Sequence, residues 1–93
     1  MGNVRPGRVI DAALRRKGFR CDSTRDHLFY YFDGTSIKTK ISHGMMGSTV
    51  GVKLISDMAH QLHLAKPQFL ALIDCPLDEE GYRNILRGQG FAV

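Results

Sequence analysis

Residues able to do chemistry concentrate in one stretch of the chain, from Cys21 to Gly44. The runs His27 to Phe32 and Thr35 to Ser42 are rich in aromatic and β-branched residues, which favour β-strands. Successive side chains of a strand point to opposite faces. One predicted face therefore carries an imidazole, two ammonium groups and two aromatic rings, from His27, Phe29, Tyr31, Lys38 and Lys40, with Ser36. Such a face suits a phosphodiester whose bases are unstacked.

These residue types also match the needs of RNA cleavage without a metal ion. That reaction needs a base for the 2′-hydroxyl proton, an acid for the leaving 5′-oxygen and cations for the charge on the phosphorane. Histidine suits either proton transfer, because its ordinary pKa of ~6.5 lies near working pH. In this hypothesis His27 is the acid or base, Lys40 stabilises the phosphate, Lys38 and Arg25 bind the backbone, and Phe29 or Tyr31 stacks a base.

A structural explanation of the same residues is open as well. Another element of the fold would then cover Phe29 and Tyr31, and Lys38 and Lys40 would only protect an edge strand from pairing with other chains. His27 would then make only a local hydrogen bond.

A β-hairpin must hold this face together. Asp33-Gly34 lies between the two runs and favours a two-residue type I′ turn. Such a turn pairs Phe32 with Thr35 and, at the far end, His27 with Lys40. The other face of the hairpin is expected in the core, with the residues Leu28, Tyr30, Phe32, Ile37, Thr39 and Ile41.

The flanking segments predict an α+β fold with a three-stranded antiparallel sheet. Helical spacing of apolar residues indicates a first helix from about Gly7 to Lys17, which Gly18 ends. Phe19 to Ser23 reads as the first strand. A second helix is expected to start at a Ser48 or Thr49 cap and to run to about His63. The connecting segments are predicted as an N-terminal arm over Met1 to Pro6 and a glycine-punctuated loop over Ser42 to Gly47.

The remaining residues predict a helical extension. A short buried helix is expected from Gln68 to Asp74, and a last helix follows the acidic cap Asp78-Glu79-Glu80. We therefore expect a core over residues 1–64 and an extension over residues 65–93 that packs on it, as one domain.

Composition limits the class of protein. The chain has 93 residues, which suits one small domain and not a large metabolic enzyme. The chain has 2 cysteines, Cys21 and Cys75, which we expect to be reduced thiols. It has no signal peptide and no apolar segment long enough to span a membrane, so we expect a soluble cytoplasmic protein. No cofactor motif is found, and the pair His60 and His63 lacks further ligands at a recognised spacing, so neither a cofactor nor a metal site is predicted.

Charge is distributed unevenly. The net charge is +4, and the basic residues concentrate in the part of the chain that ends at Lys53. A one-sided basic field is typical of proteins that bind a polyanion such as RNA.

Several short motifs together resemble the HicA toxin family. They are Lys17-Gly18-Phe19 between helix and strand, His27-x-x-Tyr30, the hairpin tip Phe32-Asp33-Gly34, and Ile41-Ser42-His43-Gly44 before a helix. The resemblance covers roughly Gly7 to Leu64. It implies a double-stranded-RNA-binding-like α-β-β-β-α fold, a toxin that cleaves single-stranded mRNA, His27 as the catalytic histidine and a HicB-like antitoxin as partner.

Two features differ from that family. Arg25-Asp26 stands where the family usually has Gly-Ser before its histidine, and the chain continues for some thirty residues after the second helix. The first difference favours an alternative, a module that binds RNA or DNA without chemistry. A second alternative is a protein-interaction domain that uses the hairpin edge or the apolar C-terminal helices.

Overall fold

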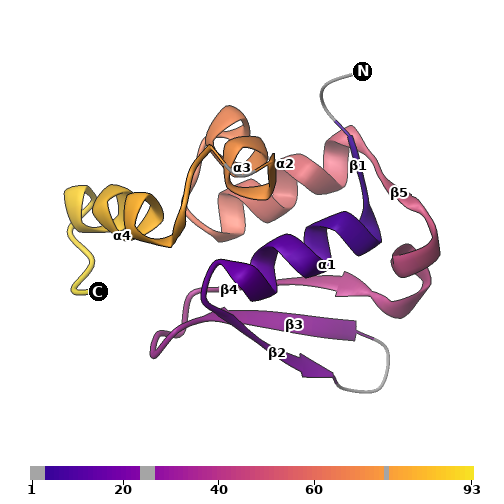
Figure 1. The fold of residues 1–93 in the computed structure, drawn as a ribbon, viewed down its shortest axis with the longest axis horizontal. Helices are drawn as coiled ribbons and strands as arrows, with labels where there is room; N and C mark the ends of the chain where they lie inside the picture. Colours follow the sequence, from indigo (N-terminus) through magenta and orange to yellow (C-terminus); the bar gives the residue numbers. More distant parts are fainter. Residues whose placement is uncertain (1–3, 24–26, 75) are drawn as a thin grey trace.

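The computed structural model describes residues 4–23, 27–74 and 76–93. It has an α+β fold in which a three-stranded antiparallel sheet carries helices on one of its faces (Figure 1). The sheet contains β2 (Phe19–Ser23), β3 (His27–Phe32) and β4 (Lys38–Ser42) in the order β2-β3-β4, which confirms the predicted meander. No helix among the described residues is long and apolar enough to cross a membrane.

The hairpin between β3 and β4 turns differently from the prediction. The backbone N–H of Phe32 donates to the carbonyl of Ile37 at 2.9 Å, so four residues form the loop, not two. Within it only Gly34 has a positive φ, 72°, whereas a type I′ turn needs two such residues. The Thr35 side chain stabilises the longer loop, because its hydroxyl donates to the Phe32 carbonyl and accepts from Ile37 N–H, each at 3.0 Å.

The longer loop moves the pairing by two residues. Tyr31 lies opposite Lys38, Phe29 opposite Lys40, and His27 opposite Ser42. The predicted pairing of His27 with Lys40 is therefore wrong. Because the side-chain period of a strand is two, a shift of two residues leaves every paired side chain on its predicted face.

Helix α1 (Gly7–Arg16) covers the sheet and ends as predicted. Gly18 follows its last turn with a φ of 91°, the left-handed conformation that glycine adopts without strain. Ile10, Ala13 and Leu14 are buried on its inner side.

The segment between the sheet and the second helix corrects three predictions, the first of which is the loop expected over Ser42 to Gly47. It contains a 3-10 helix, η1 (His43–Gly47), and a short strand, β5 (Thr49–Val50), that pairs with β1 (Arg5–Pro6). The expected N-terminal arm is thus partly a strand. Helix α2 (Val52–Gln61) begins after Gly51, not at a serine or threonine cap, because β5 holds that backbone in an extended conformation.

Residues after α2 complete the same core. Helix α3 (Lys66–Asp74) buries Phe69, Leu72 and Ile73, and α4 (Glu79–Gly88) begins after Asp78, whose carboxylate accepts from Gly81 N–H at 2.8 Å. Both helices agree with the prediction. The Tyr82 ring of α4 lies 5.7 Å from the Phe19 ring and 4.8 Å from the Phe32 ring, between centroids, and its hydroxyl donates to the Leu62 carbonyl.

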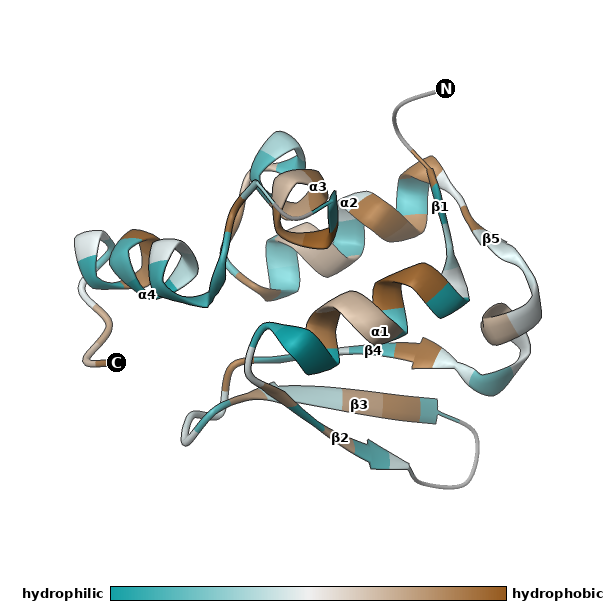
Figure 2. Cartoon of the chain, in the orientation of Figure 1, coloured by the Kyte–Doolittle hydropathy of each residue, from teal (hydrophilic) through white to brown (hydrophobic). Residues whose placement is uncertain are grey.

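Two of the polar contacts that attach the C-terminal helices to the first part of the chain involve α3 and the residues after it. The C-terminal end of α1 is strongly hydrophilic (Figure 2). Lys17 directly follows it, yet the Lys17 residue is only 7% exposed. Its ammonium group donates to the carbonyl of Leu72 at 2.6 Å and to that of Leu77 at 2.7 Å.

The second contact joins β1 to the end of α3. The Arg5 guanidinium donates to both carboxylate oxygens of Asp74, with Nε at 2.8 Å from Oδ1. This hydrogen bond lowers the pKa of Asp74. Because the pKa of Asp74 is lower in the folded than in the unfolded chain, the pair stabilises the fold fully at any pH above the ordinary carboxyl pKa. This stabilisation is lost as the pH falls through the lowered pKa of the folded state.

Candidate nucleic-acid interface

The face of the sheet opposite the helices is open to solvent, as far as the described residues show. We call it the open face and define it by the outward residues of its three strands: Arg20, Asp22, His27, Phe29, Tyr31, Lys38 and Lys40. The charged residues of β2 and β4 on this face are exposed, and the residues of β3 are half-buried. The structural explanation in which another element covers Phe29 and Tyr31 is therefore wrong for the described part of the chain.

Cations lie over the aromatic rings of this face. The Arg20 guanidinium carbon is 4.9 Å from the Tyr31 ring centroid, and Lys38 Nζ is 5.6 Å from that same centroid. The Phe29 centroid has Lys38 Nζ at 5.7 Å and Lys40 Nζ at 6.0 Å. Cations within about 6 Å of a ring centroid are attracted by its quadrupole. The open face thus alternates rings and positive charges across three strands, with Asp22 as its acidic residue.

His27 lies at the end of β3, beside this cluster. Its ring meets the Phe29 ring edge-on, with centroids 6.1 Å apart and planes at 86°. It also lines a hollow of about 300 Å³ that continues over β4 toward η1 and α2. Lys40, Asp57 and Gln61 line the same hollow, so the fold brings an imidazole, an ammonium group and a carboxylate to one cavity even though His27 and Lys40 are not paired.

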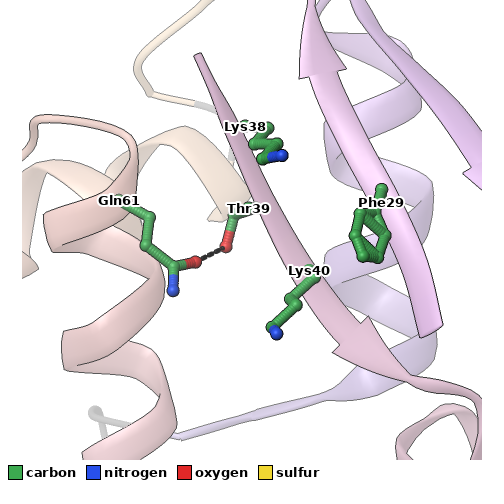
Figure 3. Close-up of a pocket in the computed structure, with 5 residues that line it drawn as sticks. All are labelled: Phe29, Lys38, Thr39, Lys40 and Gln61. Atoms are coloured by element: carbon green, nitrogen blue, oxygen red, sulfur yellow. Dashed lines mark hydrogen bonds between the residues drawn. The ribbon is translucent and has the colours of Figure 1, made fainter. Parts of the chain in front are cut away.

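A second hollow, of about 280 Å³, lies at the edge of β4. Phe29, Lys38, Thr39, Lys40 and Gln61 line it (Figure 3). Thr39 is 2% exposed, and its hydroxyl donates to Oε1 of Gln61 at 2.6 Å. We call this cavity the edge hollow. Lys40 and Gln61 line both cavities, so the two adjoin each other.

Sequence reasoning missed three residues of this region. Arg20 belongs to the predicted first strand but was not linked to the site, although it pairs with Tyr31 across the sheet. Asp57 and Gln61 come from α2, and no sequence pattern indicates that this helix borders β4.

Arg25, expected to bind the backbone of RNA, and its neighbour Asp26 lie outside the described residues. Among the residues that the structure does describe, no group of three or more His, Cys, Asp or Glu side chains could hold a metal ion.

Comparison of the chain with protein-family models, with curated proteins and with solved structures gives no match in any of the three. The geometry of the open face and of the two hollows beside it is therefore the basis for assigning a function.

Proposed function

We propose that this protein binds single-stranded RNA across the open face of its sheet. The observation that supports this proposal is the alternation of Phe29 and Tyr31 with Arg20, Lys38 and Lys40. Bases in a duplex are stacked on each other, so aromatic rings at the surface of the sheet favour the unstacked bases of a single strand. A role in RNA binding would place the protein in the cytoplasm.

Binding in this proposal exchanges one set of contacts for another. A base that stacks on Phe29 displaces the ammonium groups of Lys38 and Lys40 from that ring. Their long side chains then reach the flanking phosphates, where they replace condensed counterions. In the same way, Arg20 would leave the Tyr31 ring when a base stacks there and would contact a flanking phosphate.

The salt dependence of binding tests this proposal. For single strands, log K falls with log salt by about 0.7 for each neutralised phosphate. The double variant Lys38→Gln/Lys40→Gln keeps the length of both side chains and removes their charge, so its slope should be about 1.4 smaller. Fluorescence anisotropy with a labelled uridine oligomer at several KCl concentrations measures it.

Arg8→Gln is the matched control. It removes a charge from an exposed position on α1, on the helical side of the sheet, and should leave the slope unchanged. If the double variant and this control have equal slopes, phosphates do not contact the open face.

Cleavage of the bound RNA is a second candidate function, in the manner of a HicA-like toxin. It is favoured by the hollow that His27 shares with Lys40. In this proposal the 2′-oxygen attacks phosphorus, a 2′,3′-cyclic phosphate forms and the 5′-oxygen leaves with a proton. His27 would transfer one of the two protons, and Lys40 would stabilise the phosphorane. A HicB-like antitoxin would be the protein partner of such a toxin.

His27→Ala tests the cleavage proposal. General acid-base catalysis contributes typically ~10² to 10⁴ in rate, so we expect a loss of that size with single-stranded RNA in EDTA. His60→Ala, an exposed histidine near the end of α2, is the control and should cleave like wild type. Equal cleavage by the His27 variant would remove that residue from the mechanism, and no cleavage by wild type would leave a binding module.

A protein-interaction domain built on the C-terminal helices has less support. Their large apolar side chains, including Phe69, Leu72, Tyr82 and Leu86, are already buried in the core. A partner that packs in a groove would find few of them exposed.

A further inference from the structure

The edge hollow offers hydrogen-bond donors from a fixed position. Gln61 is the last residue of α2, and its side chain reaches toward β4 (Figure 3). The buried hydroxyl of Thr39 donates to the amide oxygen of Gln61. This bond orients the amide and leaves its Nε2, a donor with two hydrogens, as the polar group that Gln61 presents.

The two charged side chains of the edge hollow are donors too. Lys38 and Lys40 carry ammonium groups, which donate and cannot accept. The Phe29 ring supplies an apolar wall. A ligand that pairs with Gln61 Nε2 and these ammonium groups and packs on Phe29 therefore presents a flat ring with acceptors at its edge.

Guanine meets this requirement better than the other bases. Its O6 and N7 are two adjacent acceptors. Adenine places an amino donor beside N7, cytosine carries an amino donor at N4, and uracil offers O4 without a second acceptor beside it. A donor that faces the amino group of adenine leaves both groups unsatisfied. The cavity, about 280 Å³, lies near the lower limit of ~300 Å³ for small-molecule sites, which suits a single base.

We propose that the edge hollow binds one guanine base of the RNA strand, with O6 and N7 toward Gln61 Nε2 and Lys40 and the ring against Phe29. The ammonium group of Lys40 has three N–H donors, so it donates to the base while it stays beside the flanking phosphate. This inference rests on the proposed binding of single-stranded RNA and adds a preference for one base. Gln61 is the residue that determines the preference.

Binding of oligonucleotides that differ in one central base tests the inference. The probes are labelled uridine 11-mers whose sixth base is guanine, adenine or 7-deazaguanine, which lacks the N7 acceptor. Wild type should bind the guanine probe roughly tenfold more tightly than the adenine probe, and the 7-deazaguanine probe should fall between them.

The variant Gln61→Glu separates base recognition from general affinity. A carboxylate still accepts the Thr39 hydroxyl but replaces the Nε2 donor with an acceptor, so the ratio of guanine to adenine affinity should fall to about one or below. Gln68→Glu, an exposed position on α3, adds the same charge away from the cavity and should keep the ratio of wild type.

The outcomes distinguish the two proposals. Equal affinity of wild type for the guanine and adenine probes would overturn the guanine site and leave RNA binding intact. An unchanged ratio in Gln61→Glu would overturn the role of Gln61. If wild type binds none of the probes, RNA binding fails and the guanine site fails with it.

Discussion

The double variant Phe29→Ala/Tyr31→Ala is expected to bind single-stranded RNA about 100-fold more weakly than wild type. Stacking of a base on an aromatic side chain contributes roughly 1 to 3 kcal/mol, and two such contacts are lost. The loss should exceed that of the double variant Lys38→Gln/Lys40→Gln, because each ring also orients the cations beside it.

The fold should tolerate this change. Both rings are half-buried on the open face, and neither belongs to the buried core. Tyr31→Phe keeps the ring and is the control that should bind within about twofold of wild type. Anisotropy with a uridine oligomer measures affinity, and circular dichroism checks that the variants are folded. Wild-type affinity in a folded double variant would show that bases do not stack on this face.

The variant Lys17→Met is expected to destabilise the fold by about 2 kcal/mol. Methionine retains most of the apolar stem but leaves the carbonyls of Leu72 and Leu77 without their donor. Hydrogen bonds that involve a charged group contribute ~1.5 to 3 kcal/mol each, and relief from burying the ammonium group offsets part of that loss. Such a change lowers Tm by roughly 10 °C in a domain of this size.

Arg8→Met is the matched control for this effect. It makes the same kind of replacement at an exposed position of α1 and should stay within about 0.5 kcal/mol of wild type. Urea unfolding of both variants gives the free energies. Equal stability of the two would mean that the Lys17 contacts contribute nothing to holding α3 against α1.

Local patterns were sufficient for much of the fold. The approximate bounds of α1 and β2, the start of α4 and the meander of the sheet follow from apolar spacing, from Gly18 and from the Asp78 cap. The faces of the hairpin also follow from alternation alone, since a slip of two residues does not exchange them. The sequence could not show the length of the turn, because the Thr35 hydrogen bonds that favour the longer loop compete with the intrinsic preference of Asp33-Gly34.

Tertiary contacts decided the rest. β1 and β5 are two residues each and pair across more than forty positions of sequence, so neither carries a local signal. The burial of Lys17 depends on the carbonyls of a helix that the chain reaches only much later. In the sequence Gln61 is an ordinary polar residue at the end of a helix. Its role depends on the packing of α2 beside β4, where the Thr39 hydroxyl donates to its amide oxygen.

By itself, then, the sequence determined the α+β fold class, the two faces of the hairpin and the aromatic and basic character of one of them, because these depend on residue type and on periodicity along the chain. The tertiary structure alone decided that the helices leave this face open, that His27 shares a cavity with Lys40, and that α2 brings Gln61 to the edge hollow. The physical reason is that these features depend on how separate elements pack, which involves residues far apart in the chain and leaves no periodic pattern within any one segment.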